Sequence, residues 1–84
     1  MYEVALSRRA NRYYRRVDEA TARRLRLCFD ELRRNPFASR NVRPVLGRPD
    51  TFRYRVGALR VIFSVDRDSM AVRVHIIGPR GDVY

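Results

Sequence analysis

Arginine side chains are the groups in this sequence best suited to chemistry. All 19 basic residues are arginine, and against 9 acidic residues they give a formal net charge of +10. Arginine stays protonated at physiological pH, and its planar fork of N–H donors matches the oxygens of a phosphate group. The composition therefore predicts a polyanionic partner, either a nucleic acid or an acidic protein.

Three of these arginines lie in a segment that reads as two strands around the turn Gly57-Ala58. Side chains alternate between the two faces of a strand, which places Arg53, Arg55 and Arg60 on one face together with Ile62. The opposite face takes the apolar residues Phe52, Tyr54, Val56, Leu59, Val61, Phe63 and Val65. Like charges on neighbouring strands destabilise a sheet unless a ligand neutralises them. The pattern predicts that Arg53, Arg55 and Arg60 bind phosphate; the alternative is a solvent-facing strand surface in an arginine-rich protein.

Two further candidates follow the last expected strand. Arg80 and Tyr84 belong to a tail that opens with Gly78-Pro79. A guanidinium and a titratable phenol close to the three strand arginines would suit the gripping and cutting of a phosphodiester. Taken without the other residues, a tyrosine at this position is better explained as a loose chain end.

The chain contains one histidine and one cysteine, His75 and Cys28. A single cysteine allows no intrachain disulfide, and this pair provides no metal site. Alternation within an expected strand places His75 with Arg73 and Ile77, away from Val74 and Ile76, which favours a structural histidine over a hydrolase catalyst. Cys28 falls on an apolar helix stripe and is interpreted as a small core residue.

The elements that must position these residues can be read from periodicity and caps. Tyr2, Val4 and Leu6 alternate over a strand at 2–6, Ser7 caps a helix from 8 to about 16, and Asp18 caps a second helix that stops at Asn35-Pro36. The second helix has the apolar stripe Ala22, Leu25, Cys28, Phe29 and Leu32. A loop at 35–50 includes a short strand near 42–46, and strands follow at about 51–56, 59–66 and 70–77.

This order predicts one α+β domain over residues 1–84, in which antiparallel strands form a small twisted sheet packed on a helical hairpin. No apolar run reaches the roughly 18 residues that span a bilayer, and the N-terminus lacks the features of a signal peptide. We therefore expect a cytoplasmic protein that has no membrane partner.

Taken together, these segments resemble the RelE/ParE superfamily of toxins from type II toxin–antitoxin pairs, on the RelE side. The resemblance rests on Leu46-Gly47 and on the segments 52–57, 59–63 and 77–84, and the order of strands and helices extends it over the whole chain.

The resemblance implies an endoribonuclease that cleaves messenger RNA in the ribosomal A site by attack of a 2′-hydroxyl, with no metal and no cofactor. It gives Arg53 and Arg55 positions that are often basic, Arg60 a phosphate-binding role, Arg80 the assistance of the leaving group and Tyr84 the role of base. Arginine keeps its proton up to pH ~12, so neither Arg53 nor Arg55 can easily act as the base here.

The resemblance also implies a cognate antitoxin that is acidic and partly disordered, and a possible toxin–antitoxin hetero-oligomer. Two alternatives share the sequence features. A ParE-like toxin would inhibit DNA gyrase without catalysis, and a degenerate member would be a basic nucleic-acid-binding module.

Overall fold

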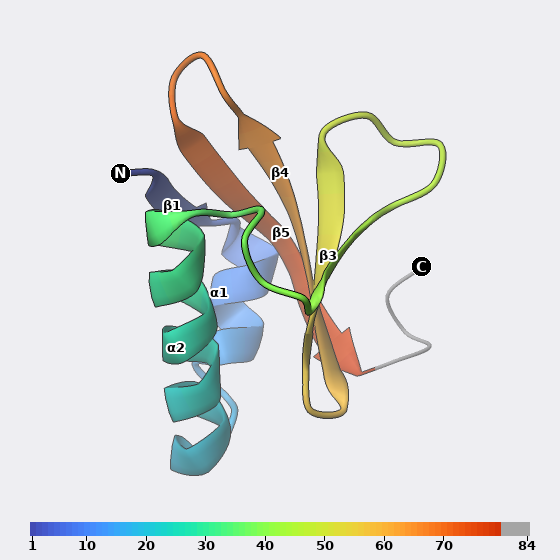
Figure 1. The fold of residues 1–84 in the computed structure, drawn as a ribbon. Helices are drawn as coiled ribbons and strands as arrows, with labels where there is room; N and C mark the ends of the chain where they lie inside the picture. Colours follow the sequence, from blue (N-terminus) through green and yellow to red (C-terminus); the bar gives the residue numbers. More distant parts are fainter. Residues whose placement is uncertain (80–84) are drawn as a thin grey trace.

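The computed structural model describes residues 1–79 of the chain. Within these residues two helices lie against one face of a five-stranded sheet (Figure 1). The elements are β1 (Glu3–Leu6), α1 (Arg8–Tyr14), α2 (Glu19–Arg34), β2 (Val42–Pro44), β3 (Thr51–Val56), β4 (Leu59–Asp66) and β5 (Ala71–Pro79). The predicted α+β class and order of elements are confirmed. Neither helix of the described part is long and apolar enough to cross a membrane.

The strands are ordered β1-β5-β4-β3-β2 across the sheet. Neighbours from β2 to β5 run antiparallel, as predicted, whereas β1 pairs with β5 in the parallel sense, so the sheet is mixed. Tyr2 N–H donates to the carbonyl oxygen of Arg33 at 2.8 Å, and Glu3 N–H donates to that of Met70 at 3.0 Å. These bonds attach the first strand both to the end of α2 and to the start of β5.

The core lies between the helices and the sheet. The stripe predicted for the second helix is buried in full: Ala22, Leu25, Cys28, Phe29 and Leu32. From the sheet it meets Tyr54, Val56, Val61, Phe63, Val65, Val72, Val74 and Ile77. Burying apolar surface contributes about 25 cal/mol per Å², and a one-residue slip in register would turn these side chains to the other face. The core therefore fixes which residues of β3 and β4 point away from the helices.

A β-bulge interrupts β5 at His75. Two consecutive residues of β4 pair with Ile76 and Val74, which leaves His75 between them without a cross-strand partner. The extra residue shifts the alternation beyond it. Ile77 therefore enters the core at 4% exposure and Ile76 takes the other face, so the predicted grouping of Ile77 with His75 is wrong. No residue type in this segment signals the extra residue of a bulge. A prediction that assumes regular alternation along the strand therefore assigns Ile76 and Ile77 to the wrong faces.

Ser7 connects this bulge to the start of α1. As the N-cap, its side-chain oxygen accepts a hydrogen bond from Ala10 N–H at 3.0 Å, and the same hydroxyl donates to the carbonyl oxygen of His75 at 2.7 Å. Ser7 N–H also donates to the carbonyl oxygen of Val74 at 2.8 Å. One residue thus holds the helix terminus and the bulged strand in a fixed relation.

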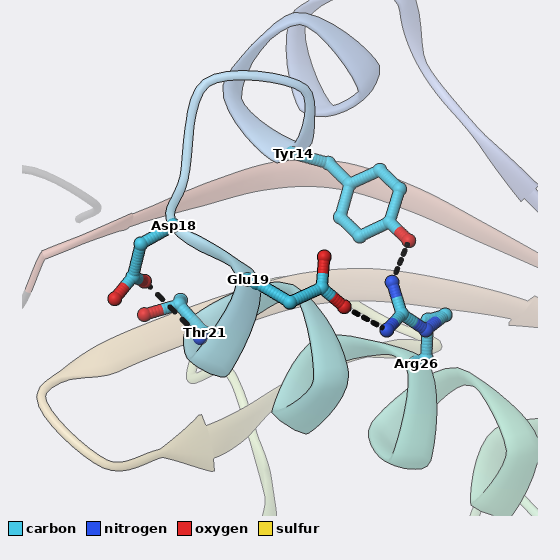
Figure 2. A network of polar contacts seen from close by, with 5 residues as sticks. All are labelled: Tyr14, Asp18, Glu19, Thr21 and Arg26. Carbon is cyan, nitrogen blue, oxygen red and sulfur yellow. Dashed lines mark hydrogen bonds and ion pairs between the residues drawn. The ribbon is translucent and has the colours of Figure 1, made fainter.

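The turn between the helices is held by exposed polar contacts (Figure 2). Asp18 caps α2 by accepting a hydrogen bond from Thr21 N–H at 3.1 Å. The Arg26 guanidinium donates to the Tyr14 hydroxyl at 3.2 Å and to the Glu19 carboxylate at 2.7 Å, and so bridges both helices. Water screens an exposed ion pair of this kind, so its effect is to orient the turn more than to stabilise the fold.

Two elements end earlier than predicted. α1 ends at Tyr14, because Arg16 N–H bonds to the carbonyl oxygen of Tyr13 at 3.0 Å and tightens the last turn. β2 ends at Pro44, and the chain then turns through Gly47, whose φ of 78° is accessible to glycine without strain. Neither change alters the set of residues on each face of the sheet.

Replacing Ser7 with alanine removes the cap acceptor and the donor to the His75 carbonyl. A lost N-cap costs ~1 kcal/mol and a lost hydrogen bond a similar amount, so the free energy of unfolding should fall by about 1–3 kcal/mol. Urea unfolding followed by circular dichroism measures this. Ser7→Thr, which keeps both functions, should lie much closer to wild type, and equal losses in the two variants would contradict this role for Ser7.

Candidate phosphate-binding site

Polar side chains line a hollow on the sheet face that is turned away from the helices. The described residues around it are Arg40, Asn41, Arg43, Arg53, Arg55 and Arg60, and its volume is about 280 Å³. We refer to this site as the arginine hollow. Five of these six side chains carry a permanent positive charge, and none of the six is acidic, so the surroundings favour an anion.

The strand register brings the three predicted arginines together. Arg55 lies directly opposite Arg60 in the β3–β4 pair, and Arg53 lies opposite Arg43 in the β2–β3 pair. Residues paired in this way have Cβ atoms roughly 4.5–5.5 Å apart, and like charges at that range repel. A bound polyanion would remove this repulsion. The structure thus shows the three side chains at one hollow, and their role in binding phosphate stays a prediction.

The arginines differ in how deeply they are set. Arg53 and Arg55 are exposed, whereas Arg60 is half-buried. Ile62 follows Arg60 on the same face, as predicted, but it is only 1% exposed, since it lies between Arg53 and Ile76 in the register. Long arginine stems cover apolar surface of this kind while their charged ends stay in water.

Sequence reasoning missed half of the hollow: Arg40, Asn41 and Arg43. Arg43 Nη1 donates to the backbone carbonyl oxygens of residues 40 and 42, at 2.7 and 2.9 Å, so its guanidinium folds against the loop before β2. Arg55 N–H donates to the carbonyl oxygen of Asn41 at 3.3 Å. The usable signal was the short strand expected near 42–46, because pairing it with strand 51–56 would have placed Arg43 beside Arg53.

Tyr54 anchors β3 from the opposite side of the sheet. Its side chain is 4% exposed, and its hydroxyl donates to Glu31 Oε2 of α2 at 2.8 Å. Burial, and then this hydrogen bond, raise the pKa of Tyr54, so the phenol stays neutral and keeps its proton to donate. Because Arg53 and Arg55 flank Tyr54, the bond to α2 holds the stretch of strand that presents both guanidinium groups.

The other candidate residues are spread over the rest of the chain. Arg80 and Tyr84 lie outside the described residues. Cys28 is a core residue, as predicted, and burial raises the pKa of its thiol, which keeps it protonated and unreactive. His75 Nε2 lies 2.8 Å from Ser64 Oγ on β4. Among residues 1–79, no three His, Cys, Asp or Glu side chains gather in a way that could hold a metal ion.

A second concave surface lies beside α1 and the turn that follows it. It joins two depressions of about 580 and 270 Å³ that share Tyr13 and Arg16. The apolar residues that line it are Tyr13, Val17, Val56, Ala58, Leu59, Ile76, Ile77 and Pro79, and its arginines are Arg9, Arg12, Arg16 and Arg24. Asp18, Thr21 and Gly78 complete the lining. We refer to this surface as the arginine-rimmed groove. A lining that combines apolar residues with four arginines favours an amphipathic, acidic segment.

Comparison with protein families decides the class of the molecule. Residues 4–84 match the family described as "ParE toxin of type II toxin-antitoxin system, parDE". The chain belongs to this toxin family. The resemblance to the RelE/ParE superfamily stated from the sequence is thereby confirmed. No curated protein sequence matches the toxin significantly.

Solved structures support the same fold. The toxin matches a chain of the archaeal RelE–RelB complex from Pyrococcus horikoshii OT3 with a TM-score of 0.85 and 26% identity, over 95% of the toxin and 96% of that chain. The isolated Escherichia coli RelE toxin matches with a TM-score of 0.82 and 22% identity, over 100% and 92%. The YoeB/ParE toxin from Agrobacterium tumefaciens gives 0.81 and 15%, over 93% and 98%. At 22% and 15% sequence identity, the last two matches show a shared fold and nothing more.

Replacing Tyr54 with phenylalanine removes the hydrogen bond to Glu31 while keeping the buried ring. A hydrogen bond to a charged group contributes about 1.5–3 kcal/mol, reduced here because Glu31 is partly exposed, so we expect a loss of about 1–2 kcal/mol in unfolding free energy. Chemical denaturation of the toxin measures it. Tyr2→Phe removes the same atom from a tyrosine outside this bond and should change stability by less than about 0.5 kcal/mol; similar losses in both would contradict the anchoring role.

Proposed function

We propose that the toxin is a ribosome-dependent endoribonuclease that cleaves messenger RNA in the ribosomal A site. The observation that carries the proposal is the convergence of Arg53, Arg55 and Arg60 at one hollow, joined by Arg40 and Arg43. A hollow whose described lining is cationic and polar suits the backbone of a single strand of RNA, which presents one negative charge per nucleotide.

In this reaction the 2′-oxygen of the RNA attacks the adjacent phosphorus while the bond from phosphorus to the 5′-oxygen breaks. The proton of the 2′-hydroxyl passes to a base, the departing 5′-oxygen takes up a proton, and the products are a 2′,3′-cyclic phosphate and a 5′-hydroxyl. Negative charge on the phosphoryl oxygens develops in the transition state. Permanently charged guanidinium groups held by the sheet stabilise that charge without reorganising.

The residues divide the work according to their chemistry. Arg60, half-buried between strands, is assigned the main contact to the phosphoryl oxygens, and Arg53 and Arg55 hold the flanking backbone. Arginine cannot release its proton near neutral pH, so the base must be another group. We assign that role to Tyr84 and the assistance of the leaving oxygen to Arg80. Charge neutralisation rests on the guanidinium groups, and the proposal requires no metal or cofactor.

A second candidate function follows from the family name. The matched family is that of ParE toxins, and a ParE-like toxin would inhibit DNA gyrase without cutting RNA. Primer extension on messenger RNA after induction separates the two. Discrete cuts within translated codons support the nuclease, whereas DNA breaks with an SOS response support the gyrase inhibitor.

Arg60→Ala tests the nuclease directly. Removing one contact that stabilises transition-state charge costs about 2.7–4 kcal/mol, so the rate of cleavage of ribosome-bound messenger RNA should fall by about 10²–10³-fold. Purified ribosomes programmed with a defined message provide the assay. Arg60→Lys keeps the charge but loses the planar fork, and should fall between alanine and wild type.

The matched control is Arg23→Ala, which removes the same charge from the exposed side of α2. It should cleave within a few-fold of wild type. A folded Arg60→Ala protein that cuts as fast as this control would remove Arg60 from the mechanism. A wild-type protein that leaves messenger RNA intact on the ribosome would end the nuclease proposal altogether.

We further propose that the toxin's partner is an acidic, partly disordered antitoxin that docks in the arginine-rimmed groove. Two of the RelE structures with similar folds are complexes with RelB antitoxins, the archaeal one at 26% identity. The groove's apolar side chains would receive one face of an amphipathic segment, and its four rim arginines would pair with acidic residues on the flanks.

Reversing the charge at two rim positions, Arg12→Glu with Arg16→Glu, should weaken antitoxin binding. Breaking contacts between opposite charges in an interface typically costs 2–5 kcal/mol, so a loss of about 10²–10³-fold in affinity is expected. Calorimetry with the cognate antitoxin is the measurement. Arg23→Glu with Arg34→Glu makes the same change in net charge on α2 outside the groove, and equal weakening by both pairs would show that net charge alone drives binding.

A further inference from the structure

The sheet face that carries the arginine hollow continues beyond it onto β5. Register places Ser64 of β4 opposite Arg73, and Ile62 opposite Ile76, on the face turned away from the helices. Ser64, Arg73 and His75 therefore form a polar group at the far end of the same surface. The residues of this group differ from those of the hollow, since a hydroxyl and an imidazole replace most of the guanidinium groups.

The bulge changes what lies beside His75 on this face. Alternation alone already turns His75 away from the core, but it would turn Ile76 toward the core. With the bulge, Ile76 leaves the core as well, and His75 Nε2 lies 2.8 Å from Ser64 Oγ. Bulges are over-represented beside active sites. The hydroxyl of Ser7 donates to the His75 carbonyl oxygen at 2.7 Å and so helps to fix the backbone at the bulge.

Ser64 and His75 can still form hydrogen bonds to a ligand after they have bonded to each other. The Ser64 hydroxyl retains an acceptor position, and the second ring nitrogen of His75 makes no hydrogen bond to another described residue. Burial, and then the nearby charge of Arg73, lower the pKa of His75, which leaves a neutral imidazole with one donor and one acceptor nitrogen. A neutral donor–acceptor pair fits the edge of a nucleobase better than it fits a phosphate.

Its distance from the hollow suits one continuous strand of RNA. Ser64 follows Arg60 by four residues on β4, which at about 3.3 Å per residue separates them by roughly 13 Å. At about 3.4 Å per stacked nucleotide, this span corresponds to three or four nucleotides, and to fewer when the strand is extended. A strand whose phosphate lies in the hollow can therefore pass over Ile76 and bring a base that is a few nucleotides away to Ser64.

We propose that Ser64 and His75 form a nucleobase-binding subsite that reads a base near the phosphate held in the arginine hollow. The inference rests on the proposed function in assigning RNA as the ligand. Phosphate contacts position a nucleic acid and base contacts give selectivity, so the subsite adds sequence preference to a surface that otherwise binds any polyanion.

Direct binding tests the subsite without any cleavage. Toxin labelled for side-chain NMR is titrated with a mixed-sequence hexaribonucleotide and, separately, with inorganic polyphosphate as a probe of charge alone. The His75 ring signals should shift with the RNA and stay in place with polyphosphate, whereas the arginines of the hollow should respond to both. Ring signals that ignore the RNA, or that follow polyphosphate equally, would overturn the proposal.

Variants separate base reading from folding. Ser64→Ala and His75→Ala should each raise the Kd for the hexaribonucleotide about five- to tenfold and leave the Kd for polyphosphate unchanged. His75→Gln, which keeps a hydrogen-bonding atom near the Nε2 position, should restore part of the affinity. Ser69→Ala, in the turn after β4, is the matched control and should bind as wild type does. Equal weakening toward both probes would indicate a structural role only.

Cleavage profiles give the second measurement. On ribosomes with a message of many codons, the two alanine variants should compress the ratio between the most and least used cut sites at least fivefold, with a smaller change in the summed rate. An unchanged ratio would contradict base reading in the enzyme. If wild-type toxin makes no cuts, the nuclease proposal fails by itself, and the binding measurements still decide whether the subsite exists.

Discussion

The division of the β3–β4 hairpin between two faces is the constraint on which the rest of the molecule depends. Tyr54, Val56 and Val61 turn toward the helices, and this requires Arg55 and Arg60 to turn away, directly opposite each other. A slip of one residue would bury guanidinium groups without partners and expose the core, which makes the register costly to change. The apolar core thus imposes an arrangement of like charges that the sheet by itself would disfavour.

Much of this arrangement could be predicted from the sequence, because it follows from local patterns. The stripe on α2, the caps at Ser7 and Asp18, and the alternation around Gly57 each depend on residues close together in the chain, and each is found in the structure. The grouping of Arg53, Arg55 and Arg60 follows from that alternation alone. The α+β class follows in turn from the order of the elements.

The features that escaped prediction depend on pairing between distant segments. Arg43 joins the hollow only because β2 pairs with β3. A strand of three residues is too short for its sequence to indicate which strand it pairs with. The bulge at His75 depends on how β5 fits both β4 and the N-cap at Ser7, which lies 68 residues away in sequence. Parallel pairing of β1 has the same origin. In all three cases the local sequence allows more than one arrangement, and contacts between distant segments determine which one forms.

The like charges at the hollow also connect stability with binding. A polyanion bound to facing guanidinium groups would neutralise them and stabilise the folded toxin by mass action. Small domains of this size bury a limited fraction of their surface and have little stability in reserve. The bond from Tyr54 to Glu31 and the double role of Ser7 therefore matter beyond their own energies. They hold the two strands that carry the charge, β3 directly and β4 through β5, so that a ligand of the hollow would meet a site already formed and would not have to assemble one.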